Sequence, residues 1–335
     1  MIEQKNIKID PNLFNFINTE VLNGLNISSE HFWSGFSDIV DIYYKKNNDL
    51  LNIRKNLQSK INDWHVAHRS KDIDLDEYKK FLKEINYIVR EGPEFKITTS
   101  NVDKEISTIC GPQLVVPITN ARFALNAVNA RYGSFYDALY GTDALGDMPE
   151  SNNYESERGM RVVAFAKSHL DKFAPLINTS WEDINKIQLI ENKIILSSSN
   201  NSNVNLENND QIIGWRLNQE STVSELILLK NNLHCRILIN ANDTIGKNDP
   251  ANIADILVES AISTILDCED SVATVDADDK ILAYRNWLGL VKGDLQAEFK
   301  KNNQVVTRTL NEDVKFTSNK GSEEFLKTRS LMLIR

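Results

Sequence analysis

Three carboxylates directly follow an apolar run in the last quarter of the chain. In the stretch STILDCEDSVATVDADDK (residues 263–280), Asp267, Glu269 and Asp270 come straight after the apolar residues of STIL. A short apolar run of this kind predicts a strand that is buried on both faces. Carboxylates grouped at a strand end can organise a cation or hold an arginine. These three residues are therefore candidates for supporting an active site.

Two structural alternatives compete with this interpretation. Acidic residues also favour the first turn of a helix, where Asp270 or Ser271 could serve as the cap. A calcium loop beginning at Asp276 is excluded, because Ile281 stands where an EF-hand needs glycine and the bidentate glutamate is absent. The stretch is then either a helix start or a carboxylate cluster at a strand end.

Arginines accompany two further apolar runs. PQLVVPI (residues 112–118) precedes Arg122, and RSLMLIR (residues 329–335) ends on Arg335. Chemistry-capable groups at or after the C-terminal ends of three buried strands are typical of a parallel βα barrel. The same alternation of helices and strands fits an open doubly wound sheet. Arg122 could equally be an ordinary surface arginine.

The elements that position these groups differ along the chain. Apolar residues recur at helical spacing through the first ninety residues, with Asp10 and Ser28 as helix start signals, which predicts an all-helical region. Between residues 150 and 248, a helix is followed by alternating strands. A helix is expected over residues 249–262, with Pro250 at its start. It should lead directly into the strand that precedes Asp267.

A second pair of strands is expected before the final apolar run. QVVTRTLN (residues 304–311) and DVKFTS (residues 313–318) predict a hairpin. The sequence contains no glycine-rich phosphate loop of the P-loop or GxGxxG type. An anionic ligand would therefore have to be held by arginines placed individually.

Composition excludes several classes of protein. The 335 residues carry a formal net charge of −9 and no basic run, which disfavours nucleic-acid binding. Three separated cysteines, Cys110, Cys235 and Cys268, form neither a zinc motif nor a disulfide framework. No stretch has the ~20 apolar residues of a membrane span, and the first residues lack a signal-peptide core. We expect a soluble, cytoplasmic protein with reduced thiols.

Four long stretches carry a resemblance to a known family. They are GPQLVVPITNARFALNAVNARYGSFYDALYGTD (residues 111–143), LKNNLHCRILIN (residues 229–240), residues 245–295 around DCEDS, and RSLMLIR (residues 329–335). In this order they resemble malate synthase, specifically its monomeric G isoform. The likeness is collinear from the N-terminus to the last residue, which makes it far more specific than any short motif.

The resemblance implies a fold and a reaction. The fold would be of the α/β class: a partial TIM (β/α)8 barrel with an N-terminal all-helical clasp and an inserted α/β domain. The family condenses acetyl-CoA with glyoxylate and water to malate and CoA in the glyoxylate cycle, using Mg²⁺. The implied boundaries are 1–90 for the clasp, 91–133, 260–292 and 329–335 for the first part of the barrel, and 134–259 and 293–328 for the insertion.

Site residues follow from the same resemblance. Arg335 matches the catalytic arginine, which binds glyoxylate and stabilises the developing enolate. Asp267, Glu269 and Asp270 would support the active site close to it. The positions that match contacts to acetyl-CoA are Val115, Arg122, Phe123, Ser271 and Arg308.

The resemblance also implies what this sequence lacks. The family's magnesium-binding carboxylates, its catalytic aspartate base and its C-terminal plug would all lie beyond Arg335, so no metal ligand is expected in this chain. We expect a fragment or split-gene half that is inactive alone and has the downstream half as a partner. The alternative is a non-catalytic remnant that binds an acyl-CoA or a partner protein.

Overall fold

The chain forms two compact units. The computed structural model describes residues 1–70, 72–151, 153–200, 202–301 and 304–335. One unit comprises residues 1–100 with 276–281, and the other comprises residues 101–275 with 282–335. In the described residues no helix is long and apolar enough to cross a membrane.

Helices dominate the first unit, but the region is not all-helical as the sequence predicted. A short antiparallel hairpin, β1 (Ile2–Gln4) with β2 (Ile7–Ile9), precedes α1 (Pro11–Phe16) and a π-helical turn (Ile17–Val21). Ile7 and Ile9 flank a lysine in IKI, and in both strands the middle residue is the most exposed, which is a strand period. The two strands were not predicted because each is only three residues long.

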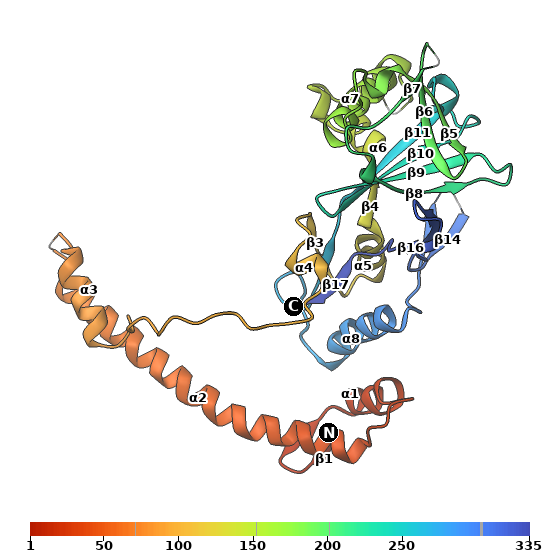
Figure 1. Cartoon of the computed structure of the whole chain (residues 1–335). Coiled ribbons are helices and arrows are strands. Elements are labelled where there is room, and N and C mark those ends of the chain that lie inside the picture. The colour runs from red at the N-terminus through yellow and green to blue at the C-terminus, as the bar shows by residue number, and fades with distance from the viewer. Residues whose placement is uncertain (71, 152, 201, 302–303) are drawn as a thin grey trace. The chain divides into compact units, whose positions relative to one another are not determined.

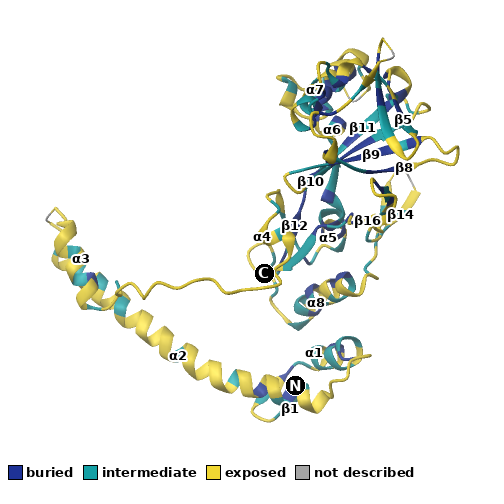
Figure 2. Cartoon of the chain, viewed as in Figure 1, coloured by how far each residue is buried: buried dark blue, intermediate teal, exposed yellow. Residues whose placement is uncertain are grey.

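Two helices follow, and the first has the predicted start signal. α2 (Ser29–Ala67) begins where Ser28 Oγ accepts a hydrogen bond from His31 N at 3.1 Å, and α3 is Leu75–Glu84. Trp64 of α2 stacks against Phe81 of α3, with ring centroids 5.7 Å apart. Most of α2 is exposed to solvent (Figure 2), and its only buried residues are Trp33 and Ser37.

A three-stranded parallel sheet opens the second unit, after the short helix α4 (Lys104–Ser107). Its strands are β3 (Gln113–Pro117), β12 (Ser263–Asp267) and β17 (Leu331–Ile334), in the order β17–β12–β3. They are the three apolar runs from which parallel strands were predicted. Val116 and Leu266 lie beneath α5 (Ala121–Val128) and the 282–292 part of α8 (Ala277–Lys292), so these helices share one core with the sheet.

The larger sheet of the second unit is antiparallel (Figure 1). Its spatial order is β16–β15–β8–β9–β10–β11–β4. The bounds are β16 Glu323–Leu326, β15 Val314–Ser318, β8 Ile212–Leu217, β9 Val223–Lys230, β10 Leu233–Ile239, β11 Ile253–Glu259 and β4 Tyr132–Ser134. The fold of the described residues is therefore mixed α/β, as the sequence indicated.

Further elements pack against this sheet. They are α6 (Phe135–Tyr140), α7 (Ser156–Phe173), and a small sheet of β5 (Ile184–Ile190), β6 (Lys193–Ser198) and β7 (Asn203–Val204). Their shared core contains two fully buried tryptophans, Trp181 and Trp215. Trp181 Nε1 donates to the carbonyl of Ala174 at 2.7 Å, so its polar atom is satisfied in the interior.

Two local predictions in this unit are wrong. The segment predicted as a helix at residues 249–262 contains strand β11, because Asp249 Oδ1 accepts from Ala251 N (2.9 Å) and Ile253 N (3.1 Å) and closes a turn there. β11 then pairs along its length with β10. The expected hairpin of residues 304–318 is also absent. β14 (Gln304–Arg308) pairs with β13 (Ala297–Lys301), whereas β15 pairs with β16 and β8.

Candidate functional site

The parallel register gathers polar groups at one edge of the three-stranded sheet. Leu266 of β12 pairs with Val116 of β3 and with Ile334 of β17, so the three strands end level with one another. Asp267 is the last residue of β12, and Arg335 follows the last residue of β17. Side chains at the C-terminal ends of parallel strands meet at one edge of the sheet.

Arg335 is surrounded by the three predicted carboxylates. Its Nε donates to Asp267 Oδ1 at 3.2 Å, and its Nη2 lies 3.2 Å from Asp267 Oδ2. Nη2 also donates to Asp270 Oδ2 at 3.2 Å, and Nε lies 3.6 Å from Glu269 Oε2. The pairing with Asp267 is two-pronged, the geometry that fixes the plane of a guanidinium group.

Asp267 is the anchor of this group, because its side chain is buried while the other two carboxylates are exposed. Besides Arg335, it accepts from Glu269 N at 3.0 Å, from Ser271 N at 2.8 Å and from Ser271 Oγ at 2.6 Å. The hydrogen bonds from Arg335 and Ser271 hold the pKa of the Asp267 carboxyl well below its usual range. Asp267 in turn raises the pKa of the Arg335 guanidinium.

Backbone hydrogen bonds fix the position of Arg335 as well. Its N–H donates to the carbonyl of Leu266 at 3.2 Å, and its carbonyl accepts from Cys268 N at 2.8 Å. The parallel ladder therefore continues through the residue that bears the guanidinium group. We call Arg335, Asp267, Glu269, Asp270 and Ser271 the strand-end cluster.

The residues predicted to contact acetyl-CoA lie on β3, at the start of α5 and on β14. Val115 is 56% exposed, on the opposite face of β3 from the buried Val116. Arg122 and Phe123 lie in the first turn of α5, which Asn120 caps by accepting from Phe123 N at 3.1 Å. Both side chains are exposed.

An aromatic ring that the sequence analysis missed joins the two predicted arginines. The guanidinium carbon of Arg122 lies 4.1 Å from the centroid of the Phe299 ring, and that of Arg308 lies 5.8 Å from it. Phe299 and Arg308 share a face of the β13–β14 hairpin, because Ala297 pairs with Arg308. Correct pairing of β14 would have revealed Phe299 as a neighbour.

These arginines have no carboxylate partner within the described residues, unlike Arg335. Arg308 Nε is buried and forms no hydrogen bond with the part of the chain that the structure describes. A guanidinium group that stacks on a ring keeps its remaining donors for an anionic ligand. We call Arg122, Phe299 and Arg308 the arginine pair with its ring.

Metal ligands are not grouped in this way. Among the described residues, no three His, Cys, Asp or Glu side chains come together in an arrangement that could hold a metal ion. Both oxygens of Asp267 accept hydrogen bonds from Arg335 and Ser271, and Asp270 pairs with the same arginine. The strand-end cluster is therefore built around a guanidinium group and does not fit a magnesium ion.

Comparison with known proteins agrees with this architecture. The family model of the malate synthase N-terminal domain matches residues 12–74, and that of the malate synthase G alpha-beta insertion domain matches residues 154–231. A malate synthase G of Halalkalibacterium halodurans is 40% identical over 333 residues, which is 98% of this chain and 46% of the relative. The chain is a malate synthase G homologue.

Two further relatives agree. Malate synthase G of Corynebacterium glutamicum is 43% identical over 327 residues, covering 96% of this chain and 44% of the relative. That of Corynebacterium efficiens is 42% identical, with 96% and 43% covered. The chain thus spans less than half the length of the malate synthase G relatives that it matches and corresponds to their N-terminal portion. The family predicted from the sequence is confirmed.

Proposed function

We propose that this chain supplies the coenzyme-binding surface and the catalytic arginine of malate synthase, which converts acetyl-CoA, glyoxylate and water into malate and CoA. The observation that carries the proposal is the two-pronged contact of Arg335 with buried Asp267 at the ends of parallel strands. In this proposal β3, β12 and β17 are the first strands of a TIM barrel. Its boundaries would be those inferred from the sequence: 91–133, 260–292 and 329–335.

Arg335 would act on the negative charge that forms during the reaction. Removal of a proton from the acetyl methyl group produces an enolate oxygen, and preorganised cations lower the energy of such an oxyanion. The guanidinium group stays charged and presents planar donors, which also suit the carboxylate of glyoxylate. Asp267 would be a positioning residue, because it holds the guanidinium plane and touches no substrate. Glu269 and Asp270 would support the same orientation.

The arginine pair with its ring would bind the coenzyme. Arg122 and Arg308 have no carboxylate partner among the described residues, so their charge is available for the phosphate groups of acetyl-CoA. Val115 and Phe123 offer exposed apolar surface for the rest of the molecule. Ser271 would join the coenzyme site as a hydrogen-bond acceptor, because its N–H and its hydroxyl both donate to Asp267.

The carboxylates of the strand-end cluster are committed to Arg335 and offer magnesium no site. In the proposed enzyme the ion and the catalytic base would be held by the portion of malate synthase G that this chain does not match. That portion would also be the protein partner of this chain. Magnesium bound there would polarise the aldehyde of glyoxylate.

Reconstitution tests the proposal. The chain is co-expressed with the C-terminal portion of the Corynebacterium glutamicum relative, and glyoxylate-dependent release of CoA is measured. We expect activity with the wild-type chain and none with Arg335→Ala. A complex that forms and turns over equally well with Arg335→Ala would refute the assignment.

Calorimetric titration of the chain with acetyl-CoA distinguishes the proposed enzyme from the alternative, a non-catalytic binding protein. Binding that Arg122→Ala weakens, without turnover in any reconstituted complex, would favour a non-catalytic acyl-CoA-binding protein. Arg161→Ala is the matched control, because Arg161 is an exposed arginine that pairs with Asp147. Its affinity for acetyl-CoA should equal that of the wild type.

A further inference from the structure

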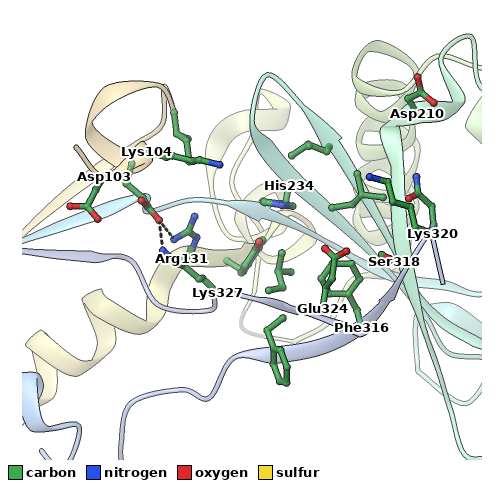
Figure 3. A pocket seen from close by; sticks show the side chains of 18 of the residues that line it. Asp103, Lys104, Arg131, Asp210, His234, Phe316, Ser318, Lys320, Glu324 and Lys327 are labelled. Atoms are coloured by element: carbon green, nitrogen blue, oxygen red, sulfur yellow. Dashed lines mark hydrogen bonds and ion pairs between the residues drawn. The ribbon is translucent and has the colours of Figure 1, made fainter. Parts of the chain in front are cut away.

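A cavity of about 950 Å³ lies in the second unit, lined by residues outside the strand-end cluster. Its walls come from α4, from the start of β4, from β10, and from β15 and β16 with the residues that follow each of them. Figure 3 shows the lining side chains, among them Lys104, Arg131, His234 and Lys327. None of these four residues belongs to the proposed malate synthase site.

A line of alternating charges runs along one wall of this cavity. Lys327 Nζ lies 3.4 Å from Glu105 Oε1, which accepts from Arg131 Nη1 at 3.1 Å. Arg131 Nε then donates to Glu259 Oε1 at 2.8 Å. The other oxygen of Glu259 accepts from His234 N at 2.8 Å and lies 3.3 Å from His234 Nδ1. Arg131 and both glutamates are buried, so the network is rigid.

This network determines which ring nitrogen of His234 carries the hydrogen. Because Glu259 accepts from Nδ1, the proton of a neutral ring sits on Nδ1 and Nε2 is left without a hydrogen. Nε2 forms no hydrogen bond with any described residue, and the side chain is 22% exposed. Burial raises the pKa of the Glu259 carboxyl, but the hydrogen bonds from His234 and Arg131 lower it by more. The net pKa is therefore below its ordinary value, and Glu259 remains an anion.

The cavity lining carries as many acidic residues as lysines and arginines, four of each, and Lys104 is a cation that lies toward His234. Figure 3 shows Lys104 and His234 turned toward one another, with Asp103 and Asp210 at opposite margins of the cavity. The ammonium group of Lys104 forms no ion pair with a carboxylate in the described part of the chain. Glu324 is the acidic side chain nearer the centre, and it accepts from Ser322 Oγ at 3.0 Å.

The cavity also has apolar walls. Phe316 and Phe325 line it together with Val102 and Ile213. A volume near 950 Å³ is at the upper end of those typical of small-molecule sites. It is far larger than a bare inorganic anion needs, so the cavity has room for an organic group beside an ionic one.

We propose that this cavity binds a small organic oxyanion, a phosphate or carboxylate attached to an apolar group, between Lys104, Lys327 and His234. The two ammonium groups compensate its charge, and His234 Nε2 accepts a hydrogen bond from a protonated oxygen or donates one once protonated. The apolar part of the ligand packs on Phe316 and Phe325. The proposal does not depend on malate synthase activity in this chain.

Direct titration tests it. Phenyl phosphate, phenylacetate and inorganic phosphate are each titrated into the purified chain, followed by calorimetry and by the NMR signal of the His234 ring. We expect saturable binding of one of the two aromatic anions, tighter than that of inorganic phosphate, with a shift of the His234 signal. The better of the two aromatic anions identifies the acid group. Failure of all three to bind at millimolar concentration would overturn the proposal.

Matched variants locate the binding. Lys104→Ala and His234→Gln should each lower the affinity for the better-binding anion at least tenfold. Lys315→Ala should change its affinity less than twofold, because Lys315 lies on β15 and pairs with Glu323. Arg122→Ala should likewise have no effect, which separates this cavity from the proposed coenzyme site. Lys104 is exposed, so its variant should fold normally. Equal affinity of wild type and Lys104→Ala, or loss of binding in Arg122→Ala, would refute the assignment.

Discussion

Arg335 and Arg122 carry the same guanidinium group in opposite surroundings. Arg335 contacts three carboxylates, whereas Arg122 stacks on the Phe299 ring and has no carboxylate partner among the described residues. A cation held by carboxylates is oriented in advance of any ligand, which suits charge that appears only in the transition state. A cation on an aromatic ring keeps its donors for a ligand that is charged from the start.

The two arginines should therefore fail in different ways. In the reconstituted enzyme, Arg335→Lys keeps one positive charge but loses the planar donor pair that Asp267 orients. We expect kcat to fall about 10²–10³-fold, as when one preorganised donor to an oxyanion is lost. Steady-state kinetics with both substrates varied measures this, and an unchanged kcat would contradict the catalytic assignment.

Replacement of Arg122 should act on binding instead. An interaction with the coenzyme that is equally strong in ground and transition states changes KM and leaves kcat intact. We expect Arg122→Ala to raise KM for acetyl-CoA about tenfold, with no change in KM for glyoxylate. Melting temperatures of the variant and the wild type provide the control, since a merely structural arginine would lower stability and show no such kinetic difference.

Asp267 should make the stability of the chain depend on pH. Its pKa in the folded state is lowered by Arg335 and Ser271, relative to about 3.9 in an unfolded chain. Ionised Asp267 therefore stabilises the fold above about pH 4, and this contribution is lost as the pH falls through the folded-state pKa. The melting temperatures of wild type and Asp267→Asn should differ at pH 7, and the difference should begin to narrow only below about pH 4.

A second background isolates the cause. In an Arg335→Gln chain the largest reason for the low pKa is gone, so Asp267→Asn should produce a smaller difference at pH 7. An equally large difference in both backgrounds would show that Ser271 and the backbone donors stabilise the carboxylate without Arg335.

At the scale of elements, sequence patterns found the strands that position the site. β3, β12 and β17 were predicted because each is a short apolar run, and the carboxylates were expected at the end of β12 for the same reason. β11 was missed because Ile253, Ile256 and Leu257 also fit a helical period. Its strand conformation comes from pairing with β10, which a local pattern does not contain.

The unforeseen part of the candidate site has the same origin. Phe299 is adjacent to Arg122 and Arg308 only because β13 pairs with β14, and the sequence favoured a different partner for β14. Likewise, the link between Glu259 and His234 joins neighbouring strands whose register cannot be read from composition. Contacts between elements were therefore less predictable than the elements themselves.

A buried ion pair between elements supplies a stability prediction. Lys167 of α7 lies 2.5 Å from Asp249, and their side chains are 4% and 2% exposed. Lys167→Met leaves the Asp249 carboxylate buried without its cation, which typically costs about 3–5 kcal/mol. Urea unfolding should show this loss, and Lys167→Met with Asp249→Asn should recover part of it, since an amide oxygen can still accept from Ala251 N.

An exposed ion pair is the matched control. Arg161 pairs with Asp147 at the surface, where such pairs contribute about 0–1 kcal/mol. Arg161→Ala should therefore change the free energy of unfolding far less than Lys167→Met. Comparable losses in the two variants would mean that burial of Lys167 does not determine its contribution.

At the scale of the whole molecule, the division into two units identifies a segment that should be susceptible to proteolysis. Residues 91–100, at the end of the first unit, form neither helix nor strand, and all are exposed. Exposed segments without backbone pairing are the preferred sites of proteolytic cleavage. Brief digestion with an endoprotease specific for glutamate should therefore cut first after Glu91 or Glu94.

The expected product is a fragment from about residue 95 to residue 335, identified by mass spectrometry. It should resist further digestion, because the large antiparallel sheet and its tryptophan core lie entirely within the second unit. It should also keep the strand-end cluster, since β3, β12 and β17 remain together. First cleavage within β9 or β10, or rapid loss of the fragment, would show that the second unit depends on the first for its stability.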